Sequence, residues 1–67
     1  MASVVVFTYR DRAGAEALAD LLRELGIPAA AVPEEDERVP EGMAWKVRVP
    51  EADAERVRML LDEVMPP

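Results

Sequence analysis

Four basic side chains are the residues of this sequence best suited to bind a ligand: Arg10, Arg12, Lys46 and Arg48. Guanidinium and ammonium groups make charge-assisted hydrogen bonds to phosphates and carboxylates. Arg10 and Arg12 lie between a strand-like run and a helical run, where the free N–H groups of a helix start favour an anion. Lys46 and Arg48 alternate with apolar residues and therefore share one face of a strand. We expect a candidate site for a small anionic ligand here; the alternative is that the four are solvated charges paired with nearby carboxylates.

Few side chains are suited to catalysis or to metal binding. The sequence contains no His, Cys, Asn or Gln, and its hydroxyl groups are those of Ser3, Thr8 and Tyr9. Imidazole and thiolate groups are the usual ligands of zinc, iron–sulfur clusters and haem, and imidazole is the commonest general base near neutral pH. Thr8 has no evident base to activate it as a nucleophile. We therefore predict a non-enzymatic protein without catalytic residues, metal or cofactor.

The acidic residues are concentrated in one segment. The chain carries 14 Asp and Glu against 8 Lys and Arg, a net charge of −6, and residues 34–37 are all acidic. This run lacks the alternate spacing of a calcium-binding loop. Because Pro33, Pro40 and Gly42 bound the charged stretch, we predict a solvated acidic loop over about residues 33–42. The acidic balance argues against nucleic acid as a partner, since phosphate contacts require the opposite charge.

Three runs of the sequence predict strands. Residues 3–9 are mostly β-branched or aromatic, and residues 27–32 form a weaker run that contains Pro28. Residues 43 or 44 to 49 alternate strictly. The alternation predicts that Trp45, Val47 and Val49 face the core while Lys46 and Arg48 face the other way.

Two apolar stripes at helical spacing predict helices. The first covers residues 12–25, begins after Asp11 as N-cap and ends before Gly26. The second begins at Pro50, which suits the first position of a helix. The side chains predicted to face inward are Leu18, Leu21, Leu22, Leu25, Val57, Leu60, Leu61 and Val64.

The order strand, helix, strand, strand, helix predicts a single α+β domain over residues 1–67. A right-handed crossover between the first two strands leaves room for the third between them. We therefore predict a ferredoxin-like βαββα fold, with a three-stranded antiparallel sheet in the order 1-3-2 and two helices on one face. The last strand of the full ferredoxin-like pattern is absent, so the first strand is an open edge.

The first strand is the candidate interface. Val4 and Val6 alternate with Val5 and Phe7, which makes both faces of the strand apolar and predicts cover on both. An open apolar edge favours association, and a chain this short without a disulfide has a marginal core. We predict a homo-oligomer, with a dimer as the expected form, that acts as a regulatory or ligand-sensing module. The alternative is a monomeric adaptor that binds another protein by sheet-edge augmentation.

The sequence gives no sign of a membrane partner. No run approaches the roughly 18 apolar residues of a membrane span, and the N-terminal residues lack the pattern of a signal peptide. We expect a cytoplasmic protein. The absence of Asn, Gln and Cys, with charge carried mainly by Glu and Arg, is typical of a heat-adapted source or of a GC-rich genome.

Three stretches together resemble a known family. Residues 7–10 lead into a helix that ends in the sequence LLRELGIPA at residues 21–29, and VPEADAER follows at residues 49–56. This pattern is similar to a family of small uncharacterised bacterial proteins labelled as signal-transducing. The resemblance covers most of the chain outside residues 33–44. It implies a βαββα fold related to PII-like and ACT-like sensing domains, and it brings no agreed catalytic residues. Some members carry a cysteine-rich zinc-binding tail, which this chain lacks.

Overall fold

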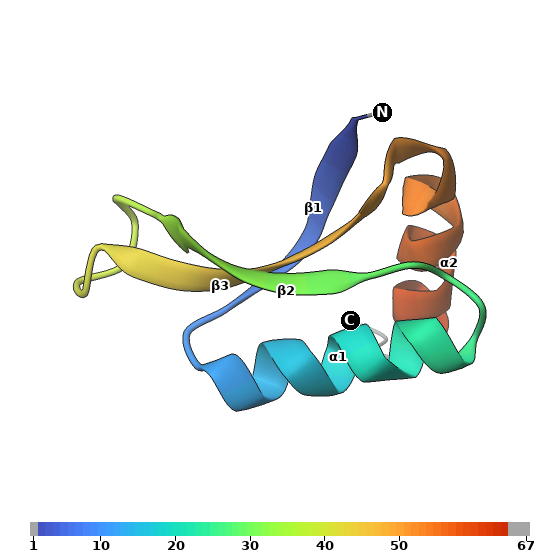
Figure 1. The fold of residues 1–67 in the computed structure, drawn as a ribbon, viewed down its shortest axis with the longest axis horizontal. Coiled ribbons are helices and arrows are strands. Elements are labelled where there is room, and N and C mark those ends of the chain that lie inside the picture. The colour runs from blue at the N-terminus through green and yellow to red at the C-terminus, as the bar shows by residue number, and fades with distance from the viewer. Residues whose placement is uncertain (1, 65–67) are drawn as a thin grey trace.

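The computed structural model describes residues 2–64, and for Val64 the backbone only (Figure 1). The elements in chain order are β1 (Ser3–Tyr9), α1 (Arg12–Glu24), β2 (Ala30–Glu35), β3 (Met43–Pro50), a short 3-10 helix η1 (Glu51–Asp53) and α2 (Ala54–Val64). This order confirms the predicted βαββα sequence of elements.

The three strands form one antiparallel sheet in the predicted order β1-β3-β2. In the centre of β3, Val47 pairs with Phe7 of β1 on one side and with Ala31 of β2 on the other. One core cluster contains Val47 and Val49 of the sheet together with Leu22 of α1 and Val57 of α2, so both helices pack against the same face. The predicted ferredoxin-like arrangement is therefore confirmed.

A β-bulge interrupts the pairing of β1 with β3. Val5 pairs with Arg48 and Phe7 pairs with Val47, which leaves Val6 as an extra residue on β1. Val6 and Phe7 consequently both pack against the core, and Val5 is left 39% exposed on the opposite face. The prediction that Phe7 lies on the same face of β1 as Val5 is wrong. The side chains of β1 that contact the core are Val4, Val6, Phe7 and Tyr9.

Helix α1 begins and ends as its sequence predicts. The side chain of Asp11 accepts a hydrogen bond of 2.9 Å from the backbone N–H of Gly14. Gly26 follows the helix with φ +85°, a conformation that an L side chain rarely adopts. Its N–H donates to the carbonyl of Arg23, and the N–H of Ile27 donates to that of Leu22, which together form a Schellman motif.

The face that α1 turns to the sheet differs from the prediction. The buried residues of the helix are Ala15, Leu18, Ala19 and Leu22. Leu21 and Leu25, which were predicted to face inward, are 43% and 46% exposed. The two alanines let the backbone of α1 approach the sheet closely, and the helix is therefore rotated so that the Leu21 side of its stripe lies outside the contact.

Strand β2 begins three residues later than predicted and extends into the acidic segment. Ile27 is 1% exposed, but it belongs to the cap of α1 and not to a strand. Pro33 pairs with Trp45, and β2 continues to Glu35, so the predicted acidic loop of residues 33–42 is shortened to residues 36–42. The strand shifts because Ile27 is held by the helix cap, which delays the start of pairing to Ala30.

The start of the second helix is also corrected. Pro50 was predicted as the first helical residue, but it is the last residue of β3 and pairs with Ser3. The turn η1 separates it from α2, which begins at Ala54. Val57 is fully buried, while the inward orientation predicted for the side chain of Val64 lies outside the described residues. Neither described helix combines the length and apolar character that crossing a membrane requires.

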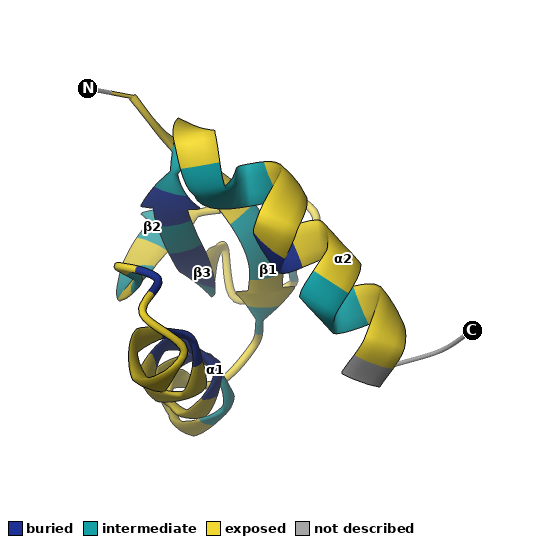
Figure 2. Cartoon of the chain, turned by 90° about the vertical axis from the view of Figure 1, so that its right-hand side faces the viewer, coloured by how far each residue is buried: buried dark blue, intermediate teal, exposed yellow. Residues whose placement is uncertain are grey.

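The result is a two-layer plate with one open side. The principal extents are 31 × 31 × 18 Å, and the buried apolar core lies between the sheet and the helices (Figure 2). Helix α1 packs against all three strands, whereas α2 packs against β1. The face of the sheet opposite the helices is uncovered, and it carries the basic residues of β3.

Candidate functional site

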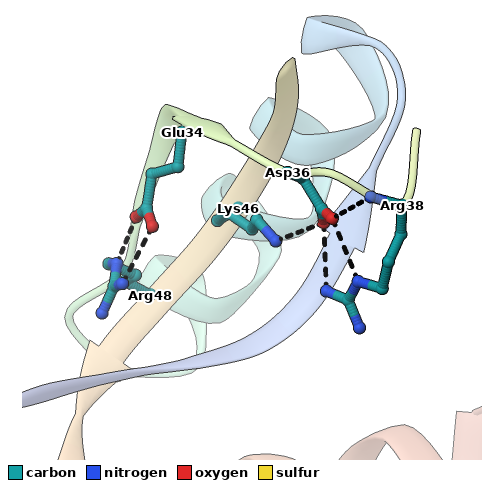
Figure 3. Close-up of polar contacts among 5 residues, drawn as sticks. All are labelled: Glu34, Asp36, Arg38, Lys46 and Arg48. Carbon is teal, nitrogen blue, oxygen red and sulfur yellow. Dashed lines mark hydrogen bonds and ion pairs between the residues drawn. The ribbon is translucent and has the colours of Figure 1, made fainter. Parts of the chain in front are cut away.

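The uncovered face of the sheet carries two separate groups of ion pairs, which join β3 to β2 and to the loop that follows β2 (Figure 3). Lys46 Nζ donates a hydrogen bond of 2.7 Å to Asp36 Oδ2. Arg38 reaches the same carboxylate through Nε and Nη2, each at 3.0 Å, and through its backbone N–H at 2.9 Å. The side chains of Asp36 and Lys46 are only 5% and 9% exposed. The Asp36 carboxylate is therefore a buried anion held by two cations.

Arg48 is paired in the same way with a second carboxylate. Its Nε donates to Glu34 Oε2, and its Nη2 donates to Glu34 Oε1 at 3.0 Å, which makes a two-point contact between planar groups. Its Nη1 donates to the backbone oxygen of Ser3 at 3.2 Å. Arg48 thus joins all three strands across the uncovered face.

These contacts favour the charged forms of two carboxyl groups, Glu34 and Asp36, and of two guanidinium groups, Arg38 and Arg48. Hydrogen bonds from Arg38 and then Lys46 hold the pKa of the Asp36 carboxyl well below its usual range, and a hydrogen bond from Arg48 lowers the pKa of Glu34. The same contacts raise the pKa values of Arg38 and Arg48. A carboxyl group with a lowered pKa is a poor proton donor or acceptor near neutral pH. The arrangement therefore suits structure better than acid–base chemistry.

The four basic residues of the sequence prediction do not converge on one site. Lys46 and Arg48 lie on the predicted face, but each is neutralised by a carboxylate of the chain. Arg12 pairs with Glu16 at 2.9 Å, and its guanidinium carbon lies 5.6 Å from the centre of the Trp45 ring, which packs against the core. Among residues 2–64, Arg10 is exposed and forms no ion pair.

The acidic run is structural over part of its length. Residues 34–37 were predicted to be a solvated tether, but Glu34 and Asp36 bind the cations of β3, and only Glu35 and Glu37 are exposed. The pattern was readable in principle: acids two residues apart on one side of a hairpin face bases two residues apart on the other. Sequence reasoning missed these roles because it placed the acids in a loop. It missed Arg38 for the same reason.

The described residues bring together no group of three or more acidic side chains that suits a metal ion. The N-terminal turn of α1, the other place predicted to favour an anion, already holds the carboxylate of Asp11. Within the described chain, every buried polar side-chain atom has a hydrogen-bond partner.

Two apolar hollows lie elsewhere on the molecule. One, of about 370 Å³, runs between α1 and α2 and is lined by Tyr9, Gly14, Ala17, Leu18, Leu21, Leu22, Leu25, Leu60 and Leu61. The other, of about 450 Å³, lies beside Arg48 where β1 and β2 begin. The first explains the exposure of Leu21 and Leu25, whose side chains form one wall of an open groove.

The edge of β1 is the remaining candidate. β1 pairs only with β3, so no described segment pairs with its second edge. Of the predicted interface residues, Val4, Val6 and Phe7 contact the core with their side chains, and Val5 alone faces outward. A strand that adds to this edge would therefore bond mainly to backbone groups of β1, beside side chains that already pack against the core.

No family model, curated protein or solved structure matches the chain.

Proposed function

We propose that this chain is a small, non-enzymatic regulatory module that works as a homo-oligomer assembled through the edge of β1. The observation that carries the proposal is the unpaired edge of this seven-residue strand. Its sequence is β-branched and aromatic and contains no proline, and an edge of that kind is a template for strand addition. A cytoplasmic location, a signalling role and a heat-adapted source belong to the same proposal.

The ligand that such a module would sense is a small anion. Arg10 supports this part of the proposal, because it is exposed at the end of β1 and forms no ion pair among the described residues. Inorganic phosphate is a suitable probe. It should raise the melting temperature of the unaltered chain, and Arg10→Ala should remove the rise while Arg23→Ala, on the outer side of α1, keeps it. An equal rise in both variants would exclude Arg10.

Light scattering over a tenfold range of concentration tests the assembly. We expect a dimer, and we expect Val5→Lys to weaken it at least tenfold, because lysine is a natural blocker of strand edges and here lies opposite Arg48. Met59→Lys is the matched control, since Met59 is 63% exposed on α2, away from the edge. Circular dichroism verifies that both variants keep their helices.

Two outcomes would overturn the proposal. One is a monomer at every concentration, which would instead favour an adaptor that offers the β1 edge to a different protein. The other is a dimer that Val5→Lys and Met59→Lys weaken equally, which would place the interface away from β1.

A further inference from the structure

We infer that the strand completing this sheet is β1 of a second copy, antiparallel and in one register, in which Val5 lies opposite Thr8 and Val6 opposite Phe7. This inference rests on the proposed function and specifies its partner and geometry. It follows from the distribution of the side chains of β1 over the two faces of the sheet.

The bulge gives β1 an unusual face pattern. Val4, Val6, Phe7 and Tyr9 contact the core, whereas Ser3, Val5 and Thr8 lie on the uncovered face. Two neighbouring residues, Val6 and Phe7, therefore face the same way. Before the bulge the even-numbered residues face the core, and after it the odd-numbered residues do. Residues paired across two strands must share a face, so a pattern with one reversal restricts the registers that it can adopt with a copy of itself.

A two-fold axis normal to the sheet makes the two β1 strands antiparallel and keeps both helical layers on one side. With Val6 opposite the partner's Phe7, core residue Val4 meets core residue Tyr9, and outer residue Val5 meets outer residue Thr8. Every pair then matches in face.

Neighbouring registers do not match. A slip of one residue puts the outer residue Val5 opposite Phe7 or Tyr9, which both contact the core. A slip of two residues puts Val5 opposite Val6, or Phe7 opposite Thr8, and each of these pairs again combines the two faces. The matching register is the one that lets the two apolar faces join beneath the helices.

The backbone supports the same register. The Glu51 N–H donates a bond of 3.1 Å to the Ala2 carbonyl, so these two residues form a hydrogen-bonded pair of the β1–β3 ladder. Hydrogen-bonded and non-hydrogen-bonded pairs alternate along an antiparallel ladder. Val5 and Arg48 are therefore a non-hydrogen-bonded pair, and the backbone groups of Val5 point toward the free edge of β1. The bond from the Asp36 N–H to the Gly42 carbonyl sets the alternation of β2 with β3. By that alternation the backbone N–H and carbonyl of Lys46 bond to β2, so Lys46 forms no backbone hydrogen bonds with Thr8, its partner on β1. The backbone groups of Thr8 therefore also point toward the free edge of β1. Val5 and Thr8 of two copies can then form a hydrogen-bonded pair.

The resulting sheet has the order 2-3-1-1-3-2 and ends at both sides in β2. In the same alternation, the backbone of Glu34 bonds to β3, so the backbone of its neighbour Pro33 faces the free edge of β2. Because proline has no N–H, this edge lacks a hydrogen-bond donor at that position. Assembly through β1 therefore closes at two copies.

Disulfide trapping tests the register, and the natural chain contains no cysteine to interfere. In the inferred register, Val5→Cys with Thr8→Cys brings opposed Cα atoms about 5.5 Å apart across the two-fold axis, within the range of a disulfide. Each single variant leaves its two cysteines about 10 Å apart along the strands, too far to be bridged. Within one chain, residues 5 and 8 are separated by a similar distance. Ser3→Cys with Thr8→Cys is the matched variant for a register slipped by two residues.

We expect the Val5→Cys, Thr8→Cys variant to form a covalent dimer under mild oxidation at least tenfold faster than the other three, as seen by non-reducing electrophoresis. If the unaltered chain is a dimer in solution but the Ser3→Cys, Thr8→Cys variant is trapped faster, or none is trapped, the register is wrong and the proposed assembly survives. If the unaltered chain is a monomer and no variant is trapped, both are overturned.

Discussion

The two edge strands, β1 and β2, differ in how they limit association. β2 contains Pro33, follows Pro28 and ends in Glu34 and Glu35, all of which disfavour pairing with another strand. β1 consists of valines and aromatic residues together with Ser3 and Thr8, and it carries no charge from Ser3 to Tyr9. The difference indicates a sheet with one closed edge and one open edge. Such a sheet can assemble with a copy of itself without growing further.

The same contrast appears on the uncovered face. The pairing of β2 with β3 is reinforced by two ion-paired groups, one centred on Asp36 and the other joining Glu34 to Arg48. On that face, the side-chain bonds found between β1 and β3 in the described chain are those from Arg48 to the uncharged oxygens of Ser3, and no ion pair joins these two strands there. We therefore expect β2 to depend on charge for its stability and β1 to depend on the apolar core.

The largest effect is expected at Lys46, on the β2 side. Lys46→Met leaves the buried Asp36 carboxylate with Arg38 alone, and removing one partner of a buried pair is strongly destabilising. We expect the melting temperature to fall by at least about 10 °C, because a loss of about 3 kcal/mol lowers the melting temperature of a domain of this size by roughly 12 °C or more. Adding Asp36→Leu to the same chain should recover most of the fall, because no buried charge is then left unpaired. Equal melting temperatures for Lys46→Met and Arg12→Ala, which breaks an exposed pair, would contradict this account.

A smaller effect is expected from acid, again on the β2 side. The pKa values of Asp36 and Glu34 are lower in the folded chain than in an unfolded one, because both carboxylates accept hydrogen bonds from cations. Their contribution to stability is therefore complete above the unfolded values, which are about 4, and is lost as the pH falls through the lower folded values. Hydrogen exchange of the backbone amides should show this. Below pH 4, protection in β2 should fall more than protection in β1, after correction for the intrinsic exchange rate, and Asp36→Asn should reduce the difference. A uniform loss across the sheet would show that these carboxylates do not set the acid limit.

The fold was predictable from the sequence, and the contacts on its uncovered face were not. Periodicity identifies α1, β1 and β3 because each has a continuous apolar pattern, and the crossover rule gives their order. Ile27 was misplaced because an apolar residue after a glycine reads equally well as the start of a strand or as the apolar contact of a helix cap. The faces of β1 were misassigned at Phe7 because a bulge depends on the pairing with β3 and leaves no mark in the strand's own sequence.

The candidate site shows the same limit. The alternation of Lys46 and Arg48 predicts their face correctly, since it depends only on the geometry of one strand. Their neutralisation by Asp36 and Glu34 depends on where β2 ends, and that is set by its pairing with β3 up to the turn that the bond from Asp36 to Gly42 closes. Contacts that require the register between two strands were beyond the reach of sequence periodicity.

The smallest change in stability, and the sharpest test of the contrast between the edges, is expected from Pro33→Thr. Threonine restores the N–H that proline withholds from the free edge of β2, and it suits a strand. We expect stability to fall by no more than about 1 kcal/mol, because proline also restricts the unfolded chain. Assembly should change more: a dimer that stops at two copies should begin to form larger species in light scattering, increasingly so with Glu35→Thr added. Glu37→Thr, in the loop that follows, is the matched control for the lost charge and should leave the dimer unchanged. If Pro33→Thr and Glu35→Thr together also leave it unchanged, then proline and charge are not what closes the β2 edge, and the twist of the sheet would have to limit assembly instead.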